Sequence, residues 1–190
     1  MGTWRLGGSF VPDYSGDQMA IESLRAGIGL GLTMIDTAEG YAAGHSEELV
    51  GEAVKGMRES VFIATKVSRA HLSYDGVLRA AEASLKRLNT SYIDLYQVHW
   101  PNPSIPIKET MSAMERLVDE GKIRFIGVSN FSVELLAEAQ EYLTKYRIAS
   151  NQVEYNILDK HIEKDLLPLA EKESITIIAY SPLAVGAVPD

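Results

Sequence analysis

Four polar side chains could together deliver a proton to a reacting group. Asp36 and Tyr41 lie five residues apart in the segment IDTAEGY, Lys66 follows in VFIATK, and His99 lies near the end of YIDLYQVHW. Reduction of a carbonyl by hydride transfer leaves a developing alkoxide, which needs a proton and stabilisation of its charge. A tyrosine is a poor acid near neutral pH, so a lysine beside it would help, and an aspartate could pair with that lysine if it is buried. Because a histidine could also donate a hydrogen bond to the carbonyl oxygen, these residue types predict a site for carbonyl reduction.

The elements that must position these residues alternate between strand-like and helix-like patterns. Amphipathic stretches with apolar residues at spacings of three and four separate the strand-like runs. The first helix is expected from Asp17 to about Ile28, opened by a capping box of Ser15 and Gln18, and Gly121 is placed to end a helix directly before a strand. The predicted strands cover residues 33–37, 61–66, 92–100, 123–129, 150–155 and 176–181, with Gly2–Leu6 as the remnant of an earlier strand.

Strict alternation of strands and helices indicates a parallel sheet, either doubly wound or closed as a barrel. No glycine-rich fingerprint follows an early strand, which disfavours the doubly wound fold. Polar residues also end one predicted strand after another, and the strand ends of a (β/α)8 TIM barrel meet at a single rim, where active sites are built. These residues are Asp36, Lys66, His99, Ser129 with Asn130, Gln152 with Glu154, and Tyr180 with Ser181. The sequence therefore predicts an α/β fold of the TIM-barrel type.

The predicted barrel is incomplete. Residues 1–190 would form one domain with about seven strands and six helices, and the last helix, strand and helix of a full barrel are not accounted for. A parallel sheet of this kind would have two open edges, which are expected to tolerate exposure poorly.

Composition excludes several classes of protein. The chain has 190 residues, a formal net charge of −8 and no cysteine, so neither a disulfide framework nor a thiolate metal site is expected, and a reducing cytoplasm is the expected location. No stretch approaches the roughly 18 apolar residues that a membrane helix needs, and the N-terminus has no apolar signal run. The acidic balance argues against nucleic acid as a partner, because phosphate binding needs a basic face. A small carbonyl compound remains the expected partner.

The sequence resembles the aldo-keto reductases over essentially its whole length. Eight segments carry the resemblance in the family's order: GTW at residues 2–4, IDTAEGY, GHSEELVGEAV, FIATKV, LKRLNTSYIDLYQVHWP, GKIRFIGVSNF, NQVEYN and AYSPLAVG. The resemblance implies a nicotinamide cofactor bound at the barrel mouth without a Rossmann domain. It also implies reduction of aldehydes or ketones to alcohols. Members of the family use NADPH more often than NADH. In this family the residues that bind the adenosine 2′-phosphate lie mostly in the region of strand eight, and none of the eight segments corresponds to that region.

The resemblance also implies a role for each matching residue. Tyr41 would be the general acid, Lys66 and Asp36 the charged pair that makes it a better acid, and His99 the donor that orients the carbonyl. The cofactor residues would be Ser129, Asn130 and Gln152 at the nicotinamide carboxamide, Tyr180 stacked on the ring, Ser181 and Leu183 at the pyrophosphate, and Thr3 beside the nicotinamide. Trp4 and Trp100 would be walls for the substrate.

Each residue taken alone has an ordinary interpretation. Asp36 could cap a turn, Lys66 could be a solvated strand end, His99 could be structural and Tyr41 could simply pack. Asn130 could start the next helix, with Ser132 as a competing cap. His45 with Glu47 and Glu48 has no third ligand at a fitting spacing, so no metal site is expected.

Three other functions stay open. The chain could be a barrel remnant without activity that senses a cofactor or binds another protein. It could be a lyase or aldolase that uses Lys66 as a Schiff base, which would require a lysine in a desolvated pocket rather than beside an aspartate. Two chains could also pair through their open edges and complete one barrel between them.

Overall fold

Six parallel strands form one sheet in the computed structural model, which describes residues 1–187. The strand order is β1-β2-β3-β4-β5-β6, so each strand pairs with the next one along the chain. The strands are β1 (Met34–Asp36), β2 (Phe62–Val67), β3 (Ile93–Val98), β4 (Ile123–Ser129), β5 (Ile148–Glu154) and β6 (Thr176–Tyr180). The α-helices are α1 (Asp17–Gly29), α2 (His45–Ala53), α3 (Tyr74–Arg87), α4 (Ile107–Asp119), α5 (Val133–Glu141) and α6 (Leu166–Glu173).

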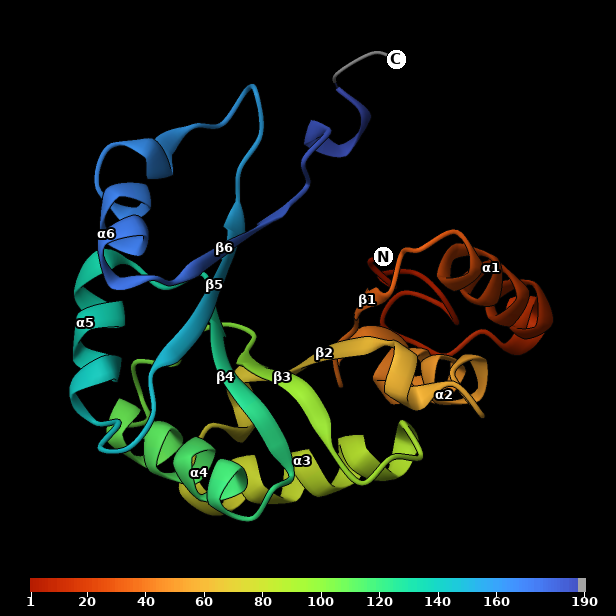
Figure 1. Cartoon of the computed structure of the whole chain (residues 1–190), viewed down its shortest axis with the longest axis horizontal. Coiled ribbons are helices and arrows are strands. Elements are labelled where there is room, and N and C mark those ends of the chain that lie inside the picture. Colours follow the sequence, from red (N-terminus) through yellow and green to blue (C-terminus); the bar gives the residue numbers. More distant parts are fainter. Residues whose placement is uncertain (188–190) are drawn as a thin grey trace.

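The sheet is curled, with the helices on its outer side (Figure 1). The edge strands β1 and β6 lie at the two ends of the curl and leave a gap between them. Alternating strands and helices with a parallel, sequential strand order make this an incomplete (β/α)8 barrel, as the sequence predicts.

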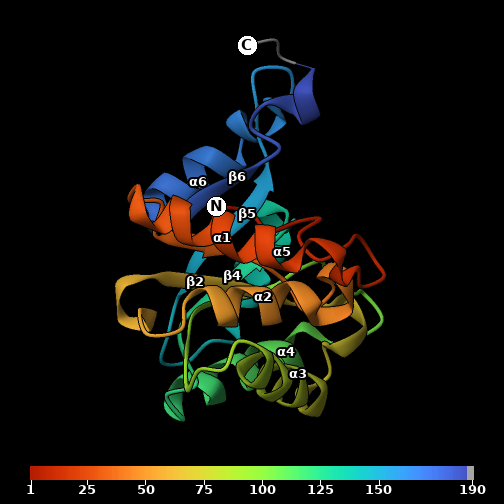
Figure 2. The same ribbon diagram turned by 90° about the vertical axis from the view of Figure 1, so that its right-hand side faces the viewer.

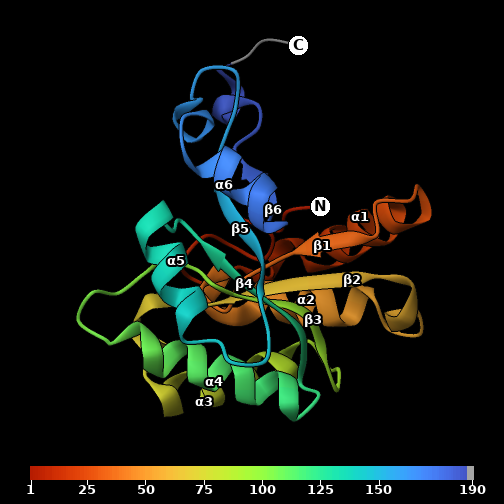
Figure 3. The same cartoon turned by 60° about the vertical axis from the view of Figure 1, so that its left-hand side comes forward.

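Helices pack side by side around the curl. α1 lies along α2 (Figure 2). Arg25 of α1 donates to the carbonyl oxygens of Glu52 and Ala53 at the end of α2. On the opposite side, α3 and α4 lie next to each other beneath the sheet (Figure 3). The buried face of α4 comprises Thr110, Met111, Ala113, Met114 and Leu117, the spacing of a helix that packs one side against a sheet.

The strand register places chemically useful side chains on the concave face. Residues paired in register across a parallel sheet point to the same side, and successive residues alternate between the two sides. Lys66 pairs with Gln97, and Gln97 pairs with Gly127. Ser129 pairs with Gln152, and Gln152 pairs with Ile178. Because side chains alternate along each strand, one set points into the barrel and the other points towards the helices.

The predicted strand at Gly2–Leu6 is wrong. Only Gly2 forms an isolated parallel bridge, with Asp36, and the Thr3 N–H donates to the Asp36 carbonyl oxygen at 2.9 Å. Arg5 then has a φ of 76°, in the left-handed region, followed by Gly7 and Gly8 with positive φ. A left-handed residue cannot continue an extended strand, so the described residues contain six strands rather than seven.

The predicted capping box before α1 is also wrong. The Ser15 N–H and hydroxyl both donate to the carboxylate of Asp13, which caps a short 3-10 helix, Tyr14–Gly16. Gln18 donates to Glu22 instead, and Gly16 is the residue that precedes α1. Asp13 therefore caps the 3-10 helix, and α1 begins without a side-chain cap.

Other predicted boundaries are confirmed. β4 covers the predicted residues, α1 begins at Asp17, and Gly121 follows α4 with a φ of 70°. The Lys122 N–H reaches back to the Leu117 carbonyl oxygen at 2.9 Å, so the chain leaves the helix in the left-handed turn that glycine favours and enters β4 at once.

Candidate active site

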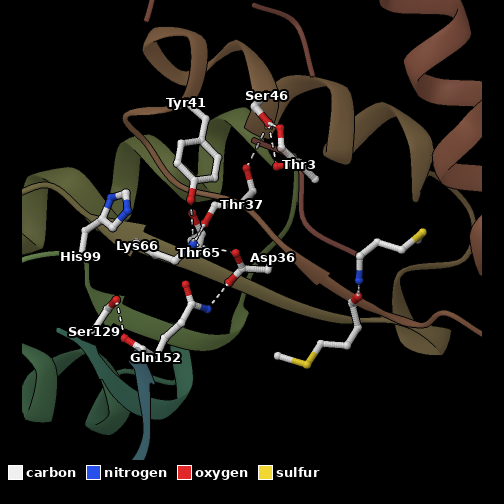
Figure 4. A network of polar contacts seen from close by, with 12 residues as sticks. Thr3, Asp36, Thr37, Tyr41, Ser46, Thr65, Lys66, His99, Ser129 and Gln152 are labelled. Atoms are coloured by element: carbon white, nitrogen blue, oxygen red, sulfur yellow. Dashed lines mark hydrogen bonds and ion pairs between the residues drawn. The ribbon is translucent and has the colours of Figure 1, made fainter. Parts of the chain in front are cut away.

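A buried ion pair joins the ends of β1 and β2. The Lys66 side chain is fully buried, and its Nζ donates to Asp36 Oδ2 at 2.7 Å and to the Thr37 carbonyl oxygen at 2.9 Å (Figure 4). The Tyr41 hydroxyl accepts a third hydrogen bond from Lys66 Nζ at 3.3 Å. Lys66 is therefore a buried cation with three oxygen partners, and not a solvated strand end.

Tyr41 reaches this cation because the chain turns sharply after β1. Its 3-10 helix, Tyr41–Gly44, contains Ala42, Ala43 and Gly44 with φ of 49°, 52° and 98°, and these left-handed residues redirect the chain into α2. A Cβ on Gly44 would lie 2.7 Å from Arg87 Cδ, so both the dihedral and the close approach require glycine there.

Two aromatic neighbours fix the Tyr41 ring. It stands edge-on to Trp4 with ring centroids 4.9 Å apart and to His99 with centroids 5.6 Å apart. This packing directs the Tyr41 hydroxyl towards Lys66 and brings His99 to the same side of the site (Figure 4).

His99 follows β3 and is held by its backbone. Its N–H donates to the Val67 carbonyl oxygen at 3.0 Å, and its own carbonyl oxygen accepts from Asn130 Nδ2 at 3.2 Å. Burial, and then the nearby charge of Lys66, lower the pKa of His99 to about 4. The imidazole is therefore neutral near pH 7 and can donate one hydrogen bond from one ring nitrogen.

A chain of hydrogen bonds links the ends of β4, β5 and β6. Ser129 Oγ donates to the Gln152 carbonyl oxygen at 2.8 Å, and Gln152 Nε2 donates to Asp36 Oδ1 at 2.8 Å. Asn130 Nδ2 donates to Ser129 Oγ at 3.0 Å, while its Oδ1 accepts from the Tyr180 hydroxyl at 3.1 Å. Asp36 Oδ1 thus connects this series of hydrogen bonds to the Lys66–Asp36 ion pair on the other side of the barrel.

Asn130 has a local role that the sequence leaves undecided. Its φ of 62° lies in the left-handed region, which asparagine tolerates better than most residues. It does not cap the next helix, because Ser132 precedes α5 and its Oγ accepts from the Leu135 N–H at 3.3 Å. The amide of Asn130 is therefore left to bridge His99, Ser129 and Tyr180.

These residues line one cavity of about 870 Å³ at the rim of the barrel. Ten of the thirteen residues proposed for the site from the sequence line it: Trp4, Asp36, Tyr41, His99, Trp100, Ser129, Asn130, Gln152, Tyr180 and Ser181. Lys66 lies behind Tyr41 and Asp36. The volume is in the range of cofactor and ligand pockets.

Thr3 and Leu183 are not brought to the cavity. Thr3 is fully buried, and its Oγ1 accepts a hydrogen bond from Ser46 of α2 at 2.8 Å, so it fastens the N-terminal segment to that helix. Leu183 lies beyond β6 with 64% of its side chain exposed. Neither residue lines the cavity, and Thr3 contacts the site only through its N–H, which donates to the Asp36 carbonyl oxygen; their roles at the cofactor stay predictions.

Several lining residues were missed from the sequence. Phe10 stacks edge-on against Trp4 with centroids 5.4 Å apart, but it lies in a loop where no periodicity points to it. Ser68 and Arg69 directly follow β2 and also line the cavity. Extending the search two residues past each strand end would have found them.

Residues 1–187 contain neither a metal-binding cluster nor a membrane-spanning helix. No group of three or more His, Asp or Glu side chains is arranged to hold a metal ion. His45 instead bonds to Asp17 and Glu48, each at 2.9 Å. No helix in this part of the chain is long and apolar enough to cross a membrane.

Comparisons with known proteins give a consistent result. The family model described as "Aldo/keto reductase family" matches residues 1–190. Methylglyoxal reductase YeaE of Escherichia coli (strain K12) is 45% identical over 183 residues, which cover 96% of this chain and 63% of that protein. The chain thus spans less than two thirds of the length of this curated relative.

Two solved structures superpose on the whole of this chain. A thermostable aldo-keto reductase, Tm1743, in complex with the inhibitor epalrestat superposes with a TM-score of 0.96 at 49% identity, covering 100% of this chain and 70% of that one. An aldo/keto reductase from Klebsiella pneumoniae in complex with NADP and acetate gives a TM-score of 0.91 at 44% identity, covering 100% and 66%. With a family model matched from end to end and solved relatives superposed on the same curled sheet, the chain belongs to the aldo-keto reductase family.

Proposed function

We propose that the protein to which this chain belongs reduces aldehydes or ketones to alcohols by hydride transfer from NADPH, with Tyr41 as the general acid. The observation that carries the proposal is the contact of the Tyr41 hydroxyl with a buried, ion-paired lysine at the wall of a large cavity. The E. coli relative, named as a methylglyoxal reductase, and the K. pneumoniae structure with NADP support the same reaction class.

Proton delivery follows from the surroundings of Tyr41. When the carbonyl oxygen gains negative charge, the tyrosine hydroxyl gives it a proton and becomes a phenolate. Lys66 Nζ, 3.3 Å from that hydroxyl, stabilises the phenolate oxygen. Asp36 balances the lysine charge at 2.7 Å, which keeps the cation in place although the Lys66 side chain is fully buried.

His99 orients the carbonyl rather than protonating it. With its pKa lowered to about 4, very little imidazolium is present near neutral pH. The neutral ring beside Tyr41 still has one N–H to donate to the carbonyl oxygen. Tyr41 and His99 would then bind the same oxygen from two sides, which fixes its position relative to the hydride donor.

The residues on β4, β5 and β6 fit a nicotinamide. Hydroxyl and amide groups of Ser129, Asn130 and Gln152 offer both donors and acceptors, which a carboxamide needs, and Tyr180 supplies an aromatic wall. When bound there, the nicotinamide supplies the hydride. Ser181 follows Tyr180 and also lines the cavity, which supports a role for it at the pyrophosphate. NADH is the alternative cofactor, because none of these groups reads the 2′-phosphate.

The opposite wall fits a small carbonyl compound. Trp4 and Trp100 line the cavity with 44% and 47% of their side chains exposed, so part of each ring is free to contact a ligand. Together with Phe10 they give an apolar wall beside the Tyr41 hydroxyl. Such a pocket would bury the carbon skeleton of the substrate and leave the carbonyl oxygen at the polar groups.

The Schiff-base alternative has less support. A lysine that attacks a carbonyl must lose its proton easily, usually in a desolvated pocket without a counter-ion. Lys66 instead has a counter-ion, because its Nζ lies 2.7 Å from the Asp36 carboxylate. Borohydride trapping with a carbonyl substrate would label Lys66 if the alternative were correct.

The test begins with cofactor binding. Titrating NADPH into the purified chain should quench the fluorescence of Trp4 and Trp100, and the quenching should saturate. Tyr180→Ala should weaken binding, whereas Tyr41→Phe should bind normally and lose about 10²- to 10⁴-fold of the turnover rate, measured as NADPH oxidation with methylglyoxal. Normal turnover by Tyr41→Phe would refute the role of the tyrosine. Absence of binding by a demonstrably folded chain would refute cofactor binding by this chain, and the inactive, partner-binding alternative would then apply.

A further inference from the structure

Arg69 brings an unbalanced positive charge to the cavity. Two lining side chains, Asp36 and Arg69, are charged near neutral pH, and the Asp36 carboxylate is occupied by Lys66 and Gln152. Within residues 1–187 no carboxylate forms an ion pair with the Arg69 guanidinium, although the chain carries 26 acidic and 18 basic residues. A cation left unpaired in so acidic a protein is an available binding group.

The backbone around Arg69 is held from both sides. The Ser68 N–H donates to the buried carboxylate of Glu39, and Asn102 Nδ2 donates to the Arg69 carbonyl oxygen at 2.9 Å. These bonds come from the loops after β1 and β3, so the loop after β2 is fixed by its two neighbours. Among residues 1–187 the Arg69 side chain has no hydrogen-bond or ion-pair partner, so its backbone is positioned while its guanidinium is available for a ligand.

Arg69 lies on the substrate side of the cavity. Val67 and Val98 are paired in register, and Arg69 and Trp100 each follow two residues later at adjacent strand ends. The groups that fit the nicotinamide come instead from β4, β5 and β6. An anion held by Arg69 would thus belong to the molecule that lies against Trp100 and Tyr41.

We propose that Arg69 binds a carboxylate of the substrate, so that the preferred substrates are aldehydes or ketones that also carry an acid group. This inference rests on the proposed reductase function and names its substrate class. A guanidinium offers two parallel N–H donors to a carboxylate, and its charge offsets the repulsion that a protein of net charge −8 exerts on anions. Phosphate groups of the cofactor are the other source of an anion, and the experiment separates the two.

The experiment compares 4-carboxybenzaldehyde with its methyl ester, a neutral molecule of similar shape. The quantity measured is the ratio of kcat/KM for the acid to kcat/KM for the ester. Arg69→Gln should lower this ratio at least about tenfold, because a hydrogen-bonded charge contact is lost only for the acid. Arg79→Gln, an exposed arginine on α3, is the matched control for net charge and should leave the ratio unchanged. Added salt should lower the ratio for the unsubstituted protein and not for Arg69→Gln.

Binding without turnover keeps the inference separate from the reductase function. Benzoate and benzamide are titrated into the same proteins by tryptophan fluorescence; the unsubstituted chain should bind benzoate more tightly, and Arg69→Gln should lose the difference. Reduction of neither aldehyde, with a benzoate preference that depends on Arg69, would refute the proposed function and leave the anion site standing. An unchanged acid-to-ester ratio in Arg69→Gln, or no binding of benzoate by the folded chain, would overturn the inference. So would a loss of NADPH affinity in Arg69→Gln with benzoate binding unaffected, since the anion would then be the cofactor's phosphate.

Discussion

Removing either partner of the Lys66–Asp36 pair should destabilise the fold, and the two changes should have unequal effects. Lys66 is fully buried, whereas 20% of the Asp36 side chain is exposed. In Asp36→Asn, the buried lysine would lose its carboxylate and have only neutral oxygens as partners, those of Thr37, Tyr41 and the new amide. In Lys66→Met, the aspartate would still accept from Gln152 and contact solvent.

The magnitudes follow from this difference. Breaking a buried ion pair by removing one partner lowers the free energy of unfolding by about 3–5 kcal/mol. We expect Asp36→Asn to fall within that range, and Lys66→Met to fall below it, at about 1–3 kcal/mol, the penalty for a buried group left without one hydrogen bond. The double variant leaves no unbalanced charge, so it should be more stable than Asp36→Asn alone.

Urea denaturation followed by tryptophan fluorescence measures these differences as shifts of the midpoint at constant slope. The order of stability should be the unsubstituted chain first, then Lys66→Met, then Asp36→Asn, with the double variant above Asp36→Asn. Equal losses from the two single variants, or additive losses in the double variant, would refute the reasoning that uncompensated charge is what destabilises them.

Three further predictions concern stability. His99 takes up a proton near pH 6.5 in the unfolded chain and at about 4 in the folded one, so the free energy of unfolding should fall as pH falls from 6.5 to 4, and His99→Gln should reduce that slope in pH-dependent melts. Arg87→Met removes the cation 2.6 Å from the fully buried Glu47 and should cost about 3–5 kcal/mol; because burial raises the pKa of Glu47, the loss measured by urea denaturation should be larger at pH 7 than at pH 5. Gly127→Ala places a Cβ 2.7 Å from Gln97 Cγ and Ser150 Oγ and should lower stability by about 1–3 kcal/mol, whereas Gly29→Ala, with nothing within 4 Å, should not.

Each of these predictions has an outcome that contradicts it. If the free energy of unfolding of His99→Gln fell with pH as steeply as that of the unsubstituted chain, the imidazole would already be protonated in the folded protein. A loss independent of pH in Arg87→Met would mean that the Glu47 charge is not the source of the destabilisation. Equal effects at Gly127 and Gly29 would show that the concave face has room for a methyl group.

The ion pair and its neighbours were predictable because they depend on few local facts. Lys66 and Asp36 end adjacent parallel strands, and the two-residue period of a strand decides that both point into the barrel. The same rule brings Ser129 and Gln152 together. Strand β4 could be located to the residue because Gly121 ends one element where the next begins.

Features that depend on distant contacts were not predictable. Thr3 is buried because Ser46, 43 residues later, bonds to it, and no local pattern reports such a contact. The turn that replaces the expected strand begins at Arg5 and continues through Gly7 and Gly8, and an arginine gives no sequence signal for a left-handed conformation. Arg69 begins a 3-10 helix, Arg69–His71, which is too short for hydrophobic periodicity to report its position.

The hydrogen bonds that join Ser129, Asn130, Gln152 and Tyr180 have a consequence for ligand binding. The side-chain donors that would meet a carboxamide are already engaged with neighbouring acceptors in this structure. An incoming amide must therefore displace internal bonds, so its own hydrogen bonds replace others of similar strength. The net enthalpy from this part of the site should be small, and affinity should come mainly from ring contacts and from groups further along the ligand. A ring without a matching amide would leave these internal bonds intact, so these four residues should also discriminate only weakly between ring ligands with and without an amide.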